Sequence, residues 1–124
     1  MREYQTILVV DDNGINRLLP GLILRPFGFS IYECENGFEA IQLIKKIPIS
    51  AVLLDISMPG MSGLDVLKVI KQNSSTHKII VIAYTSTSTE NETQNLLLNG
   101  FDAVLLKPIT SEKLLKILKT KTTE

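Results

Sequence analysis

Four short runs of apolar residues limit what this chain can fold into. The runs are Ile7–Val10, Ala51–Leu54, Ile79–Ile82 and Ala103–Leu106. Uninterrupted apolar runs of this length are typical of strands that are buried on both faces, as in a parallel sheet. A fifth run, Ser30–Cys34, has a more mixed composition, which suits a strand at the edge of the sheet. The pattern therefore predicts five strands.

Segments with helical spacing of apolar residues lie between and after these runs. Their apolar stripes are Ile15/Leu18/Leu19/Leu22, Ala40/Ile41/Ile44, Leu64/Leu67/Ile70, Leu96/Leu97 and Leu114/Leu115/Leu118. Strand and helix alternate five times, and right-handed crossovers then place helices on both faces of the sheet. A chain of 124 residues is about one domain. We expect a single doubly wound α/β domain.

Residues that cap helices support these boundaries. Three polar residues are each followed three positions later by an acidic residue, the pattern of a helix start: Asn36 with Glu39, Ser62 with Asp65, and Thr89 with Glu92. Thr110 or Ser111 can begin the last helix, and Gly28 and Gly100 stand where helices should end. The pair Pro20-Gly21 falls inside the first predicted helix. Since an interior proline removes a backbone hydrogen bond, this helix either kinks or begins late.

Polar residues stand at or just beyond the ends of the four apolar runs. Asp11 and Asp12 follow the first run, and Asp55 follows the second. Thr85 comes shortly after the third, and Lys107 directly after the fourth. The carboxyl ends of parallel strands face one crevice, where ligands bind. Three carboxylates cannot share a partly dry pocket without a counter-charge. The sequence therefore predicts a divalent cation and phosphate chemistry.

Composition excludes several other classes. The 13 basic and 13 acidic residues give a formal net charge of zero, which argues against direct nucleic-acid or anionic-membrane binding. No segment approaches the length of an apolar membrane span. The single Cys34 cannot form an internal disulfide, so a reducing, cytoplasmic location is expected.

Four segments of the chain form a recurring combination: Val9–Asn13, Leu54–Gly63, Thr85, and Lys107–Ile109. Together they resemble one known family, the response-regulator receiver domains of two-component signalling. The resemblance covers nearly the whole chain, and we assign residues 1–124 to one receiver domain with its core at 6–119. The resemblance implies a flavodoxin-like fold with strand order 2-1-3-4-5. The segment Asn13–Arg17 is similar to receivers of hybrid kinases and of single-domain regulators.

The resemblance also implies a role for each residue. Asp55 would be the nucleophile that becomes an acyl phosphate. The metal ligands would be Asp11, Asp12, Asp55 and the backbone carbonyl of Ser57, with Mg²⁺ as the ion and Mn²⁺ as an alternative. Lys107 would supply positive charge beside the phosphoryl group, and the Thr85 hydroxyl would bond to it. The Lys107-Pro108 peptide bond is expected to be cis.

The implied function is a phosphorylation-dependent signalling switch, not an enzyme. The expected phosphodonor is a histidine kinase or a histidine phosphotransfer protein, and the expected target is an effector protein or an output domain. Whether the chain acts alone or as part of a longer protein stays open. Neither nucleic acid nor a membrane is an expected direct partner.

The chain departs from the family at the position of Val104, where many receivers carry a tyrosine or phenylalanine that reorients on phosphorylation. Valine has no ring to move, so the way in which phosphorylation changes the surface of the domain is expected to be altered. Tyr84 is aromatic, but alternation along the strand points it to the side opposite Thr85.

Three alternatives remain at this point. The first is a binding module of the same fold that works without phosphorylation. The second is a phosphatase with an aspartate nucleophile, although such enzymes usually carry a second aspartate where this chain has Ser57. The third is a flavin carrier, although Asp11-Asp12 would repel its phosphate.

Overall fold

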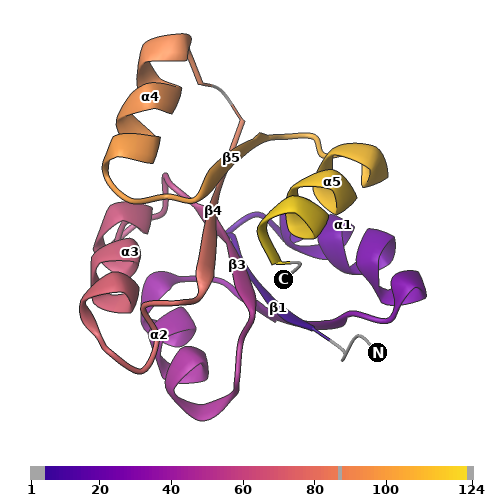
Figure 1. Ribbon diagram of the computed structural model, residues 1–124, viewed down its shortest axis with the longest axis horizontal. Helices are drawn as coiled ribbons and strands as arrows, with labels where there is room; N and C mark the ends of the chain where they lie inside the picture. Colours follow the sequence, from indigo (N-terminus) through magenta and orange to yellow (C-terminus); the bar gives the residue numbers. More distant parts are fainter. Residues whose placement is uncertain (1–4, 87, 123–124) are drawn as a thin grey trace.

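The computed structural model describes residues 5–86 and 88–122 (Figure 1). The first half contains β1 (Thr6–Val10), α1 (Gly14–Leu24), the 3₁₀ turn η1 (Arg25–Phe27), β2 (Ser30–Cys34) and α2 (Gly37–Lys46). The second half contains β3 (Ala51–Asp55), α3 (Gly63–Gln72), β4 (Ile80–Thr85), α4 (Glu90–Leu98), β5 (Ala103–Leu106) and α5 (Ser111–Thr122). This is the predicted alternation of strands and helices.

The five strands form one parallel sheet in the order β2-β1-β3-β4-β5. The predicted order and the edge position of β2 are therefore confirmed. The expectation that Ala103–Leu106 is buried on both faces is wrong, because Leu106 is 42% exposed and Ala103 and Val104 are half-buried. The reason is that β5 is the other edge of the sheet and pairs with β4 alone.

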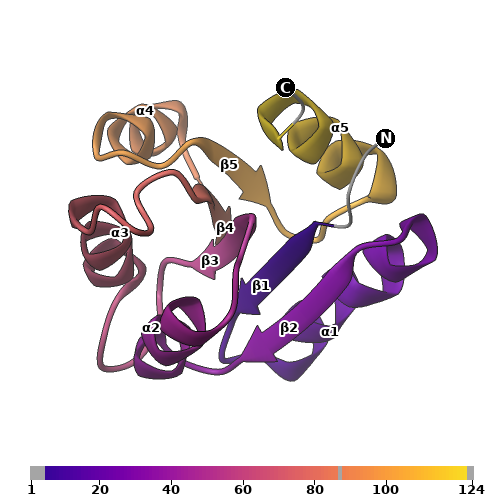
Figure 2. The same ribbon diagram turned by 60° about the horizontal axis from the view of Figure 1, so that its bottom comes forward.

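The helices cover both faces of the sheet, as Figure 2 shows, with α2, α3 and α4 on one side and α1 and α5 on the other. Each face has its own apolar core. The first core includes Ala40 and Ile44 of α2 with Val66 and Ile70 of α3. The second core joins Leu24 of α1 and Leu114 of α5 to the opposite side chains of the strands. The two cores pack the sheet from both sides and so fix where the carboxyl ends of the strands lie.

The predicted helix caps form. Ser62 with Asp65 and Thr89 with Glu92 each make a reciprocal capping box. The side chains of Asn36 and Thr110 accept the amide protons of Glu39 and Lys113. Gly28 and Gly100 have φ angles of 94° and 114°, the left-handed region in which glycine is favoured.

Helix α1 is continuous through Pro20 and begins at Gly14, so the proposed late start is wrong. Its buried residues are Pro20, Gly21 and Leu24. Of the apolar stripe predicted on this helix, Ile15, Leu18 and Leu22 face solvent, at 70%, 46% and 60% exposed. Its fourth member, Leu19, packs against the core shared with α5. The helix therefore packs through its proline face and presents an apolar face outward.

Among the described residues, no helix combines the length and apolar character needed to cross a bilayer.

Candidate functional site

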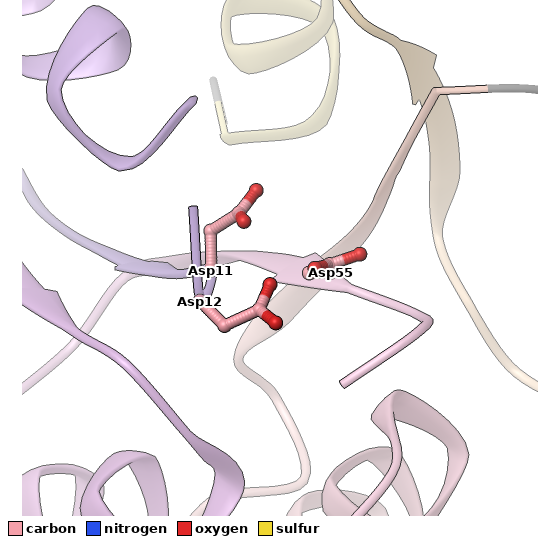
Figure 3. Close-up of side chains that lie close together, drawn as sticks. All are labelled: Asp11, Asp12 and Asp55. Atoms are coloured by element: carbon pink, nitrogen blue, oxygen red, sulfur yellow. The ribbon is translucent and has the colours of Figure 1, made fainter. Parts of the chain in front are cut away.

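The carboxyl ends of β1 and β3 bring three aspartates together, as Figure 3 shows. Asp11 and Asp12 follow β1 directly, and Asp55 is the last residue of β3. Carboxylate oxygens of the three residues all lie within 4.8 Å of one another. The strands are neighbours in the sheet, so the parallel topology predicted from the apolar runs produces this cluster.

Asp11 is fully buried. Its Oδ1 accepts the Asn13 amide proton at 2.9 Å. Its Oδ2 forms an ion pair with Lys107 Nζ at 2.6 Å. No group among the described residues donates a hydrogen bond of good geometry to this Oδ2. A buried oxygen of this kind, close to two further carboxylates, fits a hard cation, since Mg²⁺ takes oxygen ligands and retains water. Asp12 is exposed and provides the open side of the cluster.

Asp55 is 6% exposed. Its Oδ1 accepts the Ser57 amide proton at 3.2 Å and lies 3.7 Å from Lys107 Nζ. Burial, and then the negative charges of Asp11 and Asp12, raise the pKa of Asp55 to about 6, against the opposing effects of Lys107 and the Ser57 amide. A carboxylate in a crowded anionic site favours any ligand that brings positive charge.

Lys107 lies just beyond β5, and the Lys107-Pro108 peptide bond is cis, as predicted. Its side chain is only 9% exposed and reaches both Asp11 and Asp55. The Lys107 amide donates to the Thr85 carbonyl at 2.7 Å, which ties the lysine to the end of β4. From the sequence alone, Lys107 could be an ordinary surface lysine. In the structure its side chain is largely shielded from solvent and faces two carboxylates.

Thr85 ends β4 and is half-buried. It lines a groove of about 320 Å³ with Ser57, between α3 and α4. The groove runs from Ser57, beside Asp55, to the face of α4. The role expected for the Ser57 carbonyl stays a prediction.

Three features of the site were not predicted from the sequence. The Arg17 guanidinium donates to the Asp11 carbonyl at 2.9 Å. A Cβ at Gly63 would lie 2.7 Å from the Asp55 carbonyl oxygen, so a glycine here lets α3 approach the end of β3. The Tyr84 ring lies under the Lys107 ammonium, with 4.8 Å between Nζ and the ring centroid. The predicted direction of Tyr84 is confirmed, since it packs in the α1 and α5 core. Its contact with Lys107 had no signal in the local pattern.

The family model for the response regulator receiver domain matches residues 7–119. This chain belongs to the response regulator receiver domain family. Receiver domains are signalling modules of two-component systems, and the resemblance drawn from the four sequence segments is confirmed. The match runs from within β1 into α5 and includes Asp11, Asp12, Asp55, Thr85 and Lys107.

Individual relatives agree with this assignment. The chain is 34% identical over 115 residues to the sensor histidine kinase GacS of Pseudomonas protegens, covering 90% of this chain but 12% of that protein. It thus spans about an eighth of the length of the first kinases that it matches.

Two solved structures have the same fold. One is the receiver domain of the sensor histidine kinase PA1611 from Pseudomonas aeruginosa, with magnesium coordinated in its active site cleft. It aligns with a TM-score of 0.87 at 24% identity, over 98% of this chain and 100% of that one. The other is the receiver domain of Saccharomyces cerevisiae Ssk1, crystallised with the histidine phosphotransfer protein Ypd1. It aligns with a TM-score of 0.84 at 26% identity, over 96% of this chain and 89% of that one.

Proposed function

We propose that Asp55 accepts a phosphoryl group from a phosphohistidine and that this modification switches the binding of a partner. The supporting observation is the pairing of a buried carboxylate with the ammonium of Lys107, whose side chain is 9% exposed and whose Nζ is 3.7 Å away. The carboxylate oxygen attacks phosphorus and forms an acyl phosphate. The bond from phosphorus to the histidine nitrogen breaks, its electron pair stays on that nitrogen, and solvent reprotonates the imidazole.

Lys107 and Thr85 have distinct parts in this proposal. The Lys107 ammonium stabilises negative charge on the phosphoryl oxygens as they approach Asp55. The Thr85 hydroxyl donates to a phosphoryl oxygen once the group is attached. Because Thr85 also lines the groove beside α4, a change in its position reaches a surface that a partner can contact.

The three aspartates fit Mg²⁺, with Mn²⁺ as an alternative, and we infer that Asp11, Asp12, Asp55 and the Ser57 carbonyl hold it. When bound, the cation would neutralise charge on the transferring phosphoryl oxygens. The PA1611 receiver, described with magnesium in its cleft, supports this assignment. So does the crowding of three carboxylates whose oxygens lie within 4.8 Å of one another, a negative charge that the Lys107 ammonium offsets only in part.

We infer that the donor is a histidine kinase or a histidine phosphotransfer protein that docks on α1. This helix begins just after Asp12, and Ile15, Leu18 and Leu22 form an exposed apolar stripe along it. A donor must bring its histidine to Asp55, so a docking surface beside the site meets this requirement. The complex of Ssk1 with Ypd1 supports this class of partner. We place the reaction in the cytoplasm, with an effector or output domain as the target.

Phosphorylation of the purified chain tests the proposal. Incubation with Mg²⁺ and acetyl phosphate should add one phosphoryl group, found on Asp55 by mass spectrometry. Asp55→Asn should abolish the modification, whereas Glu90→Gln, which alters an exposed carboxylate on α4, should not. Modification of Asp55→Asn at the normal yield would refute the assignment. No modification of the natural chain by small donors or by histidine kinases would favour a binding module that works without phosphorylation.

The metal assignment has its own test. Mg²⁺ or Mn²⁺ should bind in the millimolar to sub-millimolar range, because few protein ligands meet a strongly hydrated ion. Asp12→Ala should weaken the binding measured by titration calorimetry at least ten-fold, with Glu90→Gln as the control. Equal affinities in Asp12→Ala and the natural chain would remove Asp12 from the ligand set.

A further inference from the structure

Pro20 leaves one carbonyl of α1 without its usual helical donor. In an α-helix, the amide of each residue donates to the carbonyl four positions earlier, and proline has no amide proton. The carbonyl concerned is that of Asn16. The Tyr84 hydroxyl donates to this carbonyl at 3.1 Å, across from β4 to α1. A side chain from the sheet thus supplies the hydrogen bond that the proline removes from the helix.

The ring of the same tyrosine lies at the acidic site. Tyr84 is fully buried, and Lys107 Nζ is 4.8 Å from its ring centroid. The ring carries negative charge density on its face and attracts an ammonium there, more strongly when water is excluded. Lys107 is only 9% exposed, so this attraction acts in a dry environment.

Burial, with the charges of Asp11 and Asp55, raises the pKa of the Tyr84 hydroxyl to about 12. At neutral pH the hydroxyl therefore keeps its proton, which agrees with its role as donor to the Asn16 carbonyl. One buried side chain thus contacts the site cation with its ring and the α1 backbone with its hydroxyl.

We propose that Tyr84 is a positioning residue that orients the Lys107 ammonium through its ring and ties Lys107 to helix α1 through its hydroxyl. The inference about Lys107 rests on the proposed function, since it concerns the cation that serves the phosphoryl group. Val104, where many receivers carry a ring, is half-buried in the other core, on the α2 and α3 side of the sheet. The ring of Tyr84 therefore lies on the face of the sheet opposite Val104, against the helix with the exposed apolar stripe.

A pair of substitutions separates the ring from the hydroxyl. Tyr84→Phe keeps the ring and should retain most of the rate of phosphorylation by acetyl phosphate. Tyr84→Met keeps much of the volume but no ring, and should lower that rate about five-fold, as expected for loss of a desolvated cation–π contact. Equal rates in Tyr84→Met and the natural chain would overturn the role of the ring.

A spectroscopic readout tests the ring without any phosphorylation. The Lys107 Cε protons should show an upfield ring-current shift in the natural chain and in Tyr84→Phe, and should lose it in Tyr84→Met. This pattern reports the contact between ring and lysine itself, and the rate of Tyr84→Met then tests whether the contact positions the ammonium. If Tyr84→Met does not fold, unshifted Cε protons in the natural chain and Tyr84→Phe would still overturn the inference.

The link to α1 is tested by combining Tyr84→Phe with Pro20→Ala. In the natural chain, Tyr84→Phe leaves the Asn16 carbonyl without that donor and should lower Tm by about 4 °C. In the Pro20→Ala background, the restored amide can donate to Asn16, so the same substitution should lower Tm by less than half as much. Equal losses of Tm in both backgrounds would contradict the link.

These experiments also distinguish two kinds of failure. If Asp55 is not phosphorylated in the natural chain, the proposed function fails, while the ring-current shift and the Tm comparison still decide the contacts of Tyr84. If Asp55 is phosphorylated and the rate, the shift and the Tm cycle are all unaffected, only the positioning role fails.

Discussion

The Lys107 ammonium lies closer to Asp11 than to Asp55: Nζ is 2.6 Å from Asp11 Oδ2 and 3.7 Å from Asp55 Oδ1. The site cation thus pairs most closely with a predicted metal ligand and not with the predicted phosphoacceptor. Both carboxylates are buried, so the lysine offsets charge that would otherwise destabilise the fold. A second cation bound at Asp11 must share that carboxylate with Lys107.

This geometry predicts that Lys107 opposes metal binding. Lys107→Met should raise the affinity for Mg²⁺ several-fold, because it removes a positive charge within a few ångströms of the ligand oxygens. Titration calorimetry at low ionic strength measures the change. Lys116→Met, at an exposed position of α5, is the matched control and should leave the affinity as it is. A weaker affinity in Lys107→Met would mean that the lysine organises the aspartates more than it repels the ion.

The raised pKa of Asp55 predicts how stability depends on pH without metal. Burial and then Asp11 raise this pKa from 3.8 to about 6, so the folded state resists ionisation of Asp55. The natural chain should therefore become more stable as pH falls from above 6 toward 4, relative to Asp55→Asn.

At pH 7.5 with a chelator, Asp55→Asn should be more stable by about 3 kcal/mol, and below pH 4 the difference should vanish. Urea denaturation at both pH values measures it. Saturating Mg²⁺ should narrow the difference at pH 7.5, because a bound cation stabilises the charged form. If Asp55→Asn were less stable than the natural chain at pH 7.5, burial and the charge of Asp11 would not be what destabilises the ionised Asp55.

Docking on α1 predicts a difference between protein and small-molecule donors. Leu18→Glu places a charge in the exposed apolar stripe, so phosphotransfer from a phosphorylated histidine phosphotransfer protein should fall at least ten-fold. Phosphorylation by acetyl phosphate should stay within two-fold, since the site itself is unchanged. Leu98→Glu, at an 82% exposed position on α4, is the control. An equal loss with both donors would point to damage of the fold and not to docking.

The conformational change that follows phosphorylation is predicted to leave β5 largely unchanged. Because Val104 has no ring to reorient, a beryllofluoride mimic of phosphorylation should shift the amide resonances of the predicted loop Thr85–Thr89 more than those of Ala103 to Leu105. Thr87, in the same predicted loop, lies outside the described residues. Two-dimensional NMR of the chain with and without the mimic measures these shifts. The largest changes centred on Val104 would contradict this prediction, as would a Val104→Tyr variant that gains nothing in partner binding.

Much of the site was predictable because it depends on the ends of strands. Apolar runs identify buried parallel strands, and parallel strands place their carboxyl ends at one edge. Asp11, Asp12 and Asp55 were therefore expected together, and their oxygens lie within 4.8 Å. Helix caps such as Ser62 with Asp65 were predictable for a local reason, since a cap depends on residues three positions apart.

The burial of individual faces was less predictable. A spacing of three and four residues shows that Ile15, Leu18 and Leu22 share one face of α1, but it does not show what covers that face. The structure buries Pro20, Gly21 and Leu24 instead. Likewise, the apolar composition of Ala103–Leu106 predicted full burial, whereas its position beside β4 alone leaves Leu106 42% exposed.

Local sequence patterns were enough to predict the order of strands and helices, the capped helix starts and the set of acidic, hydroxyl and basic residues at the site. The tertiary structure alone decided that Tyr84 lies under Lys107 and donates to the Asn16 carbonyl. The difference comes from how far apart the contacting residues are in the sequence. Local patterns specify the conformation of adjacent residues, whereas contacts among β4, the end of β5 and α1 exist only after the sheet and its covering helices have packed.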